Sequence, residues 1–510
     1  MKFTKSLWLA AISAALFALL GSSPTQATKR PRYGGTLRVE LSVTSVSLDP
    51  RTWKPGSVAA AANEKLAALI YDRLVTLDDY GHFRPALAVD WSHDTSFRTW
   101  QFKLRPGVKF SDGELFTPKE AVAVLQQLLP PGLQITATES GVQIRAAHPA
   151  PDVLEQLASG RYFVFRVLPD ASLVGTGPFV LEGALPAQQE ATPLKPLRLK
   201  FRARDDAWSG RSFVDSVDVT LGSLPLRQIL DLQVGRADII DIPPDLVRKA
   251  RQDNLRVWSS PPETLLALRL DDSQSAAANA QFREALDLAL DRDTMANVLL
   301  QRQALPADAL LPQWLSGYAF LFGNPMNVDR AKTLQASLRA SAPGGEPVRL
   351  RVDAVSDLMK LLGERVAVNA RQANMAIQIV PHVAMSTTTA ASPAIGLHLF
   401  AWHYSSLSPR VELQALAQHL HSESGAESES IEEPANPEKL YAQERGLLEE
   451  RQILPLLLLP EYVGIAPNVR NWSAEPSGSW CLADVWIEPA ASASNPDTAS
   501  DGNSAPGARP

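Results

Sequence analysis

Two carboxylates separated by a single glycine are the residues whose type and spacing first suggest chemistry. Asp112 and Glu114 lie in the run FKLRPGVKFSDGELFTPKEAV at residues 102–122. Paired carboxylates can divide the roles of general acid and general base. The Ser-Asp-Gly-Glu order at 111–114 is also typical of a turn, in which Asp bonds the local backbone and Gly relieves steric strain. We therefore interpret both carboxylates as turn residues.

The single cysteine, Cys481, is the next candidate nucleophile. One cysteine excludes an intrachain disulfide, and its context GSWCLADVW favours a strand with a buried, inert thiol. The chain has no Gly-x-Ser-x-Gly elbow, His-Glu-x-x-His motif or phosphate loop. A hydrolase would need a catalytic constellation that these residues do not supply, so we expect no enzymatic activity.

The eight histidines offer the remaining metal or cofactor chemistry. Their closest sets are His398 with His403 and His419 with His421, which are too sparse for a zinc site. The run GTGPFV at 175–180 lacks the third glycine of a dinucleotide fingerprint and is better read as a tight turn entering a strand. We expect no cofactor.

The elements that hold the 102–122 stretch in place can be read from local pattern. Residues 100–104 alternate apolar and polar side chains, which predicts a half-buried strand. Pro-Gly at 106–107 suits a type II turn, and Val108 and Phe110 then predict a returning strand. Thr-Pro-Lys-Glu at 117–120 is a capping box that predicts the start of a helix.

Further along the chain, helical and strand patterns alternate. Apolar residues recur at helical spacing over 282–300, with Asn279 available as the N-cap. Residues 197–203 and 214–221 alternate as strands. Interleaved helices and strands indicate an α/β fold with more than one sheet.

Length and composition limit the class of protein. A chain of 510 residues with 45% hydrophobic and 20% charged residues is an ordinary globular composition, long enough for two or three domains. The net charge of −6 and the absence of a basic stripe give a nucleic-acid partner no electrostatic support, so none is expected.

The N-terminus has the order of a secretory signal peptide. Lys2 and Lys5 precede an apolar run over 7–20 and a small-residue stretch that ends at Ala27. We predict that residues 1–27 are a signal peptide and that the mature chain is periplasmic. No cysteine follows the apolar run, so no lipid anchor is expected. The alternative is that the run stays attached as an anchor helix.

Six segments of the mature chain together resemble the family 5 extracellular solute-binding proteins, the receptors of ABC importers for oligopeptides, dipeptides, nickel complexes and other solutes. The segments are YGGTLRVELSVTSVSLDP (33–50), NEKLAALIYDRLVTLDDYGHFRPALA (63–88), RPALAVDWSHDTSFRTWQFKLRPGVKFSDGELFTPKEAV (84–122), VGTGPFVLEG (174–183), LQVGRADIIDIPP (232–244) and FREALDLALDRDTMANVLLQRQALPA (282–307). The resemblance implies a two-lobed, periplasmic-binding-protein-like fold of type II with an extra domain, in which the solute binds in a cleft between the lobes.

The resemblance also implies a domain plan. Domain I is discontinuous and comprises residues 32–50, 172–265 and 465–489. A shortened domain II covers 51–171, and domain III covers 266–464. The tail at 490–510 is Ala-, Ser-, Pro- and Gly-rich and is expected to be disordered. The implied partners are a small-molecule or peptide-like solute and the permease subunits of an ABC importer, with the receptor itself a monomer.

The implied ligand contacts come from two segments. Residues just after Leu-Asp-Pro face the cleft in relatives, which points to Trp53 and Val58. The other lobe carries Trp402, His403 and Tyr404, where peptide-binding relatives have a run resembling Trp-x-x-Asp-Tyr-x-Asp-Pro. The Asp that holds a peptide ammonium is absent there. This absence predicts a preference for ligands without a cationic amine, unless Glu412 or another acid replaces it.

Two alternatives stay open within and beside this family. A nickel or metallophore receptor would use a histidine beyond the Trp motif, and His419 or His421 could serve. Relatives of this domain also form the sensor halves of transcription regulators. Those regulators need a DNA-binding segment, which residues 1–27 cannot provide.

Overall fold

A single large mixed sheet connects the N-terminal and C-terminal thirds of the described chain. In the computed structural model its strand order is β10-β11-β12-β1-β13-β19-β14-β18-β16-β17, with β15 paired to β19. The bounds are β1 (Thr36–Leu41), β10 (Phe179–Leu181), β11 (Leu197–Ala203), β12 (Ser216–Leu221), β13 (Ile239–Asp241), β14 (Arg256–Leu270), β15 (Leu305–Pro306), β16 (Val348–Val352), β17 (Ile377–Val380), β18 (Leu397–His403) and β19 (Ile453–Ile465). The strands predicted at 197–203 and 214–221 are confirmed as β11 and β12.

The structure describes residues 30–489 except 79, 131, 184–190, 193, 324, 342–345, 353–355, 381–393, 422–435 and 476–478. The predicted signal peptide at 1–27 and the predicted tail at 490–510 lie outside the described residues. No helix within the described ranges is long and apolar enough to cross a membrane.

Helices alternate with the strands along the chain. The longer ones are α2 (Val58–Ile70), α3 (Pro118–Leu128), α5 (Pro225–Gln233), α8 (Ala280–Ala289), α11 (Val328–Ser341), α12 (Asp357–Gln372), α13 (Pro409–His421) and α14 (Pro437–Glu449). Short helices are η1 (Pro50–Thr52), α4 (Val153–Ala158), η2 (Pro244–Leu246), α6 (Val247–Gln252), α7 (Ser275–Ala278), α9 (Arg292–Thr294), η3 (Met295–Leu299), α10 (Gln313–Ser316) and η4 (Ala319–Leu321). The mixture confirms the α/β class.

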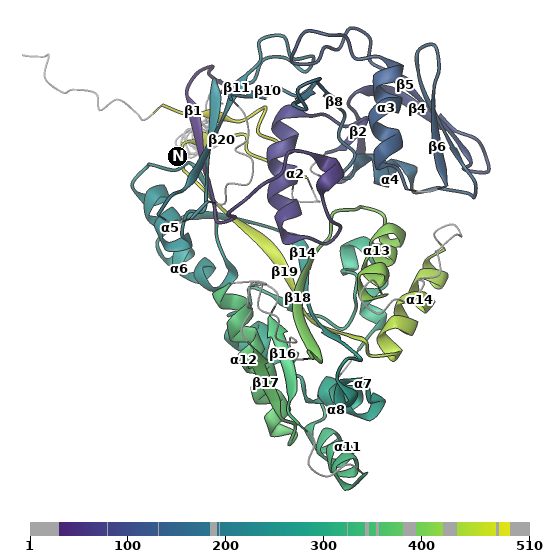
Figure 1. Ribbon diagram of the computed structural model, residues 1–510. Helices are drawn as coiled ribbons and strands as arrows, with labels where there is room; N and C mark the ends of the chain where they lie inside the picture. Colours follow the sequence, from purple (N-terminus) through teal and green to yellow (C-terminus); the bar gives the residue numbers. More distant parts are fainter. Residues whose placement is uncertain are drawn as a thin grey trace, which may run out of the picture. The chain divides into compact units, whose positions relative to one another are not determined.

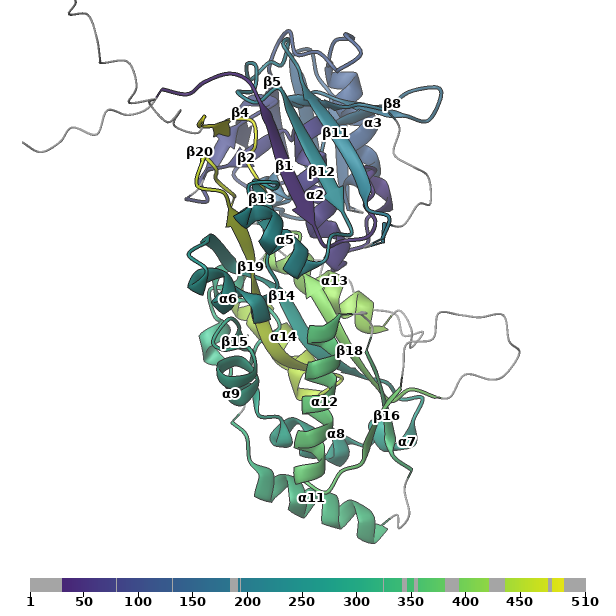
Figure 2. The ribbon, with the colours of Figure 1, turned by 90° about the vertical axis from the view of Figure 1, so that its left-hand side faces the viewer.

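β14 and β19 are the longest strands, and they pair antiparallel along most of their length (Figure 1). β19 is almost continuously apolar, as expected of a strand covered on two faces, and the second half of β14 is mostly apolar. The C-terminal end of β19, residues 462–465, packs into the core formed with β1, β12 and β13. The rest of β19 and the C-terminal half of β14 pack into two further cores beside β16 and β18. β1, β12 and β11 lie side by side at the other end of the sheet (Figure 2).

A second sheet, β4-β5-β7-β6, contains the beginning of the 102–122 stretch. Its strands are β4 (Ala88–His93), β5 (Thr99–Leu104), β6 (Leu133–Ala137) and β7 (Gly141–Ala146). Smaller strand pairs are β2 (Val75–Leu77) with β3 (Phe83–Pro85), β8 (Phe165–Val167) with β9 (Leu173–Gly175), and β20 (Val469–Arg470) with β21 (Trp486–Ile487). The predicted strand at 100–104 is confirmed as part of β5.

The local predictions for this stretch are confirmed except at one point. Gly107 has φ +75° as the Pro-Gly turn requires, and the Thr117 hydroxyl accepts a 3.4 Å hydrogen bond from the Glu120 N–H at the start of α3. The returning strand predicted at 108–110 is wrong. Lys109 makes only an isolated bridge with Leu115, because the two neighbours of β5 are β4 and β7.

The helix predicted at 282–300 is also divided. Asn279 caps α8 as expected, accepting from the Gln281 N–H at 2.8 Å, but α8 ends at Ala289. Asp291 then caps a new turn by accepting a 2.9 Å hydrogen bond from the Thr294 N–H. An Asp that bonds nearby backbone donors competes with the continuing helix, and this explains why apolar spacing alone overestimated its length.

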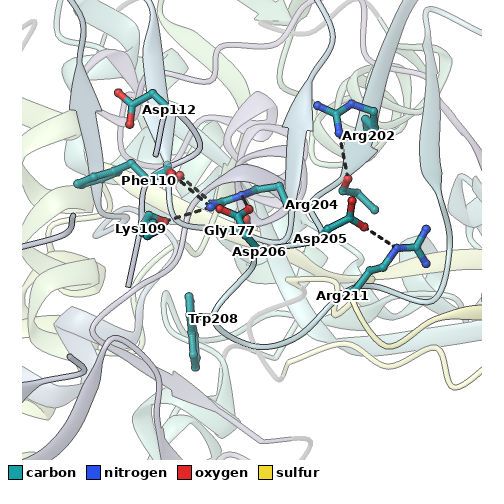
Figure 3. Close-up of polar contacts among 12 residues, drawn as sticks. Lys109, Phe110, Asp112, Gly177, Arg202, Arg204, Asp205, Asp206, Trp208 and Arg211 are labelled. Carbon is teal, nitrogen blue, oxygen red and sulfur yellow. Dashed lines mark hydrogen bonds and ion pairs between the residues drawn. The ribbon is translucent and has the colours of Figure 1, made fainter. Parts of the chain in front are cut away.

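Arg204, directly after β11, ties three chain segments together (Figure 3). Its guanidinium donates to the carbonyls of Gly177 at 3.3 Å, Lys109 at 3.2 Å and Phe110 at 3.2 Å, and its Nε donates to Asp206 at 3.1 Å. The Gly-Pro turn that enters β10 is thus bonded to the segment after β5. The GTGPFV run is a structural turn, as the sequence predicted.

Two further expectations can be compared with the fold. Cys481 is half-buried and lies outside any strand, so the prediction of a buried thiol within a strand is wrong. The domain boundary predicted between 265 and 266 falls inside β14, and contacts group the described chain from Tyr33 onward into one compact unit. The three-domain plan stays a prediction.

Candidate functional site

The two segments expected to contact a ligand meet at Gly56. The Gly56 carbonyl accepts a 2.9 Å hydrogen bond from the His403 N–H, and the two residues form an antiparallel bridge. Gly56 has φ +73°, and a β-carbon there would overlap the Trp402 indole. The segment between Trp53 and Val58 therefore lies directly against the end of β18.

Trp402 and Tyr404 lie in one apolar core with Leu413 and Leu416. The Trp402 Nε1 donates to the Glu412 carboxylate at 3.1 Å, and the Tyr404 hydroxyl donates to the Leu310 carbonyl. Both rings are almost fully buried. Their role as ligand contacts stays a prediction.

Trp53 and Val58 differ in exposure. Trp53 is buried, with its Nε1 donating to the Ser47 carbonyl at 2.9 Å and its ring edge-on to Phe163 at 6.2 Å. Val58 is the first residue of α2, and 49% of its surface is exposed. The Trp53 indole, which was expected to face the cleft, is occupied by protein contacts.

Glu412 is committed to the backbone and to Trp402. Besides the indole, it accepts from the Ser405 N–H at 2.8 Å and the Ser406 N–H at 2.5 Å. These bonds satisfy the loop that leads into α13, and burial raises the pKa of Glu412 to about 7. We conclude that Glu412 holds the Trp402 loop and is not available as a substitute for the missing Asp.

His403 has different surroundings from its neighbours in sequence. It is 3% exposed, and its Nε2 has no hydrogen-bond partner. The pKa of His403 is lowered to about 3, mainly by burial and also by the Lys65 charge, while a backbone hydrogen bond at Glu263 acts in the opposite direction. The imidazole is therefore neutral at physiological pH.

The groups around His403 form a cluster of ionisable side chains that we call the charged cluster. Its members are Glu64 and Lys65 on α2, Glu263 on β14, His403 on β18 and Glu461 on β19. Lys65 Nζ donates to a Glu461 carboxylate oxygen and lies 4.9 Å from the centroid of the Trp480 ring. The four elements that supply the cluster come from widely separated parts of the chain.

The electrostatics of the charged cluster are dominated by burial. Burial raises the pKa of Glu64 to about 8, with Arg73 acting against it. Burial and the neighbouring Glu461 raise the pKa of Glu263 to about 8, while Lys65 lowers it. Burial also raises the pKa of Glu461. Strongly shifted, buried groups gathered in one place are typical of functional sites.

Irregular pairing of two strands places Glu263 and Glu461 in the cluster. The ladder between β14 and β19 shifts register on either side of Pro262, which faces Pro460. Proline has no N–H to contribute to the ladder, and the Glu461 N–H donates instead to the Ser260 hydroxyl at 2.9 Å. The two acids thus lie where the sheet is locally interrupted.

A cavity of about 500 Å³ lies beside the same part of the two strands. Its walls include Pro261 and Pro262 of β14, Leu458 of β19, and the aromatic rings of Trp314 and Phe320. The Trp314 Nε1 donates to the Pro262 carbonyl at 2.7 Å, which fixes this wall to the strand. A mostly apolar cavity next to a few buried polar groups is the usual form of a small-molecule site.

The histidines considered as metal ligands are His419 and His421, and the described side chains form no metal site around them. His419 packs against the rings of Phe400 and Trp402, with centroids 5.3 and 5.4 Å away, and the side chain of His421 lies outside the described residues. Over the part of the chain that the structure describes, no three His, Cys, Asp or Glu side chains are grouped to hold a metal ion.

Sequence reasoning missed Glu64, Lys65, Glu263 and Glu461. A signal for three of them was present, because Glu64, Lys65 and Glu461 are charged residues inside apolar elements. Glu461 is the only charged residue of β19, ILPLLLLPEYVGI, and Glu64 and Lys65 interrupt the alanine- and leucine-rich helix α2. Charged residues are almost never fully buried without a partner, so a charged residue within an apolar run indicates a specific structural or functional role.

Comparison with known proteins gives a consistent family. A family model described as "Bacterial extracellular solute-binding proteins, family 5 Middle" matches residues 82–419. The nickel-binding periplasmic protein of Escherichia coli (strain K12) is 22% identical over 65% of this chain and 68% of its own length. Protein XP55 of Streptomyces lividans is 27% identical over 59% of this chain and 58% of its own length.

Solved structures show the same fold. The ABC transporter substrate-binding protein CtaP from Listeria monocytogenes matches with a TM-score of 0.72 and 14% identity, covering 89% of this chain and 100% of that protein. OppA from Haemophilus influenzae, in complex with RPPGFSPFR, matches with a TM-score of 0.71 and 15% identity, covering 90% and 100%. The expected two-lobed, periplasmic-binding-protein-like fold is confirmed.

Proposed function

Because the chain belongs to the family 5 bacterial extracellular solute-binding proteins, we propose that it is the exported substrate-binding component of an ABC importer. In this proposal it captures a peptide-like or other small polar solute between two lobes and delivers it to permease subunits in the membrane. It acts as a periplasmic monomer and changes no covalent bond of the solute.

The observation that carries the proposal is the position of the charged cluster. Its members come from α2 and from the neighbouring strands β14, β18 and β19 of the large sheet. A solute that contacts all of them would stabilise the arrangement in which α2 lies against these strands over one in which α2 is apart from them. The 500 Å³ cavity beside β14 and β19 supplies room for a small ligand.

Solute capture can be tested on the mature protein before the ligand is identified. Native mass spectrometry of gently purified protein should show a bound small molecule that is lost on unfolding. Adding the identified solute back should decrease the radius of gyration in X-ray scattering and raise the melting temperature with concentration. A radius that stays constant at saturation, with clear binding, would contradict closure of two lobes.

A metal complex is the second candidate cargo. It is favoured by the names of two relatives, the nickel-binding proteins of Escherichia coli and Staphylococcus aureus. Because the described residues do not gather a metal-ligating set, any metal would arrive within its own chelator. Elemental analysis of protein purified without a histidine tag distinguishes this cargo from an organic solute.

A further inference from the structure

We infer that the charged cluster binds a positively charged nitrogen group of the solute, such as an ammonium or guanidinium, through acceptor atoms of Glu64, Glu263, His403 and Glu461. This inference rests on the proposed function, since it names the chemical class of the solute. It replaces the expectation, drawn from His403 alone, that ligands would lack a cationic amine.

Several buried acceptors of the charged cluster have no donor. Glu64 Oε1, Glu263 Oε1, Glu461 Oε2 and His403 Nε2 are all buried and lack a hydrogen-bond partner. The backbone hydrogen bond at Glu263 raises the pKa of His403, which means that a ring N–H donates there and Nε2 carries the lone pair. Buried polar groups are almost always satisfied in a native state, so four unpaired acceptors in one cluster call for a donor-rich group.

The balance of charge in the cluster also favours a cation. The charged cluster contains three carboxylates and one cation, Lys65, and this cation is already engaged by Glu461. The nearest charged groups outside the cluster are Asp241, Arg73 and Glu412, which act on Glu461 or Glu64. Arg73 is itself paired with Glu475 at 2.6 Å. A bound cation would supply the positive charge that these acids lack.

Protons take the place of the cation when no solute is bound. In the unliganded state, burial keeps protons on Glu64 and Glu263, since the pKa of each is raised to about 8. A cation placed among them stabilises the ionised carboxylates, so binding releases protons. The affinity should therefore increase as the pH rises from 6 to 8, with Glu461, Lys65, Asp241, Arg73 and Glu412 as the charged neighbours that set the size of the change.

This arrangement differs from the one expected from the sequence. The absence of an Asp in the segment at the end of β18 was expected to leave an ammonium without a partner, and Glu412 was the suggested substitute. Glu412 is engaged elsewhere, whereas acids from α2, β14 and β19 surround His403. The neutral imidazole then acts as one acceptor among several, and it does not exclude a cation.

A cation supplied by mutation tests the inference independently of the solute. The variant His403→Lys places an ammonium inside the charged cluster, and His403→Met places a neutral chain of similar length there. At pH 8 we expect His403→Lys to unfold at the same urea concentration as His403→Met or higher. The advantage should disappear when Glu263→Gln is added. Unfolding of His403→Lys at a clearly lower urea concentration than His403→Met, or failure of only the lysine variant to fold, would overturn the inference.

The solute released from the wild-type protein gives the second measurement. We expect it to contain a basic nitrogen, and Glu263→Gln should weaken its binding by about ten- to a hundredfold, because a hydrogen bond to a charged group contributes roughly 1.5–3 kcal/mol. The exposed Glu182, which pairs with Lys200 at 3.1 Å, provides the control Glu182→Gln with the same loss of charge. A solute without a basic nitrogen overturns the inference and leaves solute capture intact. Binding without lobe closure would contradict the proposed function and not this inference. If the protein purifies without a solute, the stability of His403→Lys still tests whether the charged cluster accepts a cation.

Discussion

Gly56 lies flat against the indole ring of Trp402, so close that no β-carbon fits between them. Glycine is required at position 56 for a second reason as well, because its φ of +73° is a conformation that other residues rarely adopt. The hydrogen bond from the His403 N–H to the Gly56 carbonyl is made at the same place. One residue therefore joins the segment after η1 to the end of β18, next to His403 of the charged cluster.

Substituting Gly56 should destabilise the protein more than substituting a glycine with the same backbone angle elsewhere. Gly107 has φ +75° and nothing within 4 Å of its β-carbon position, so Gly107→Ala costs only the conformational term of about 1–2 kcal/mol. Gly56→Ala adds overlap with Trp402, which typically costs a further 1–3 kcal/mol or so. Urea unfolding of the two variants measures the difference. Equal losses would show that residue 56 does not contact Trp402 in the free protein.

Local sequence patterns predicted the elements whose shape depends on neighbouring residues. Strand β5, the Pro-Gly turn and the Thr117 cap of α3 follow from alternation, φ preference and capping. The helix predicted at 282–300 was too long because Asp291 offers a second cap that the apolar spacing does not reveal. The strand predicted at 108–110 failed because pairing depends on which strands are adjacent, and β7 lies 30 or more residues further along the chain.

The charged cluster could not be predicted as a site, for a related reason. Glu64, Glu263 and Glu461 are separated by about 200 residues from one to the next. The pairing of β14 with β19 brings Glu263 and Glu461 together, and Glu64 is supplied by helix α2. Glu64 and Glu461 each stood out singly as a charged residue in an apolar element. Trp402, His403 and Tyr404, which were predicted as a group, lie in different surroundings because His403 joins the charged cluster while the two aromatic rings pack in a core.

Arg204 should contribute more to stability than the other arginines near it. Its side chain is buried and donates to four backbone carbonyls and Asp206 (Figure 3). Removing it takes one donor from each of these carbonyls and breaks the buried network, so Arg204→Ala should lower the free energy of unfolding by about 3 kcal/mol. The neighbouring Arg202 is exposed and pairs with Glu182 at 3.5 Å, so Arg202→Ala should cost less than about 1 kcal/mol. Similar losses for the two would contradict a clamping role.

If the chain is exported, signal-peptide cleavage should give the mature protein a defined first residue. The positively charged, apolar and small-residue order of residues 1–27 predicts cleavage after Ala27. N-terminal sequencing of protein recovered from the periplasm should start at Thr28. A mature protein that still begins at Met1 and sediments with membranes would favour the anchor-helix alternative.

The pH dependence of stability should report on Glu64. Burial raises its pKa from 4.5 to about 8 in the folded chain, so between these values the folded chain holds a proton that the unfolded chain has lost. The resulting stabilisation is complete below pH 4.5 and is lost as the pH rises through 8. Glu64→Gln removes this dependence, because the amide needs no proton. We expect the variant to exceed the wild type by roughly 2–4 kcal/mol in free energy of unfolding at pH 9, and by much less at pH 5. Urea titrations at both pH values measure the difference, with Glu182→Gln as a control that should follow the wild type. A Glu64→Gln curve parallel to the wild type at all pH values would mean that the carboxyl is ionised in the folded chain, and the cluster would then already hold a compensating cation.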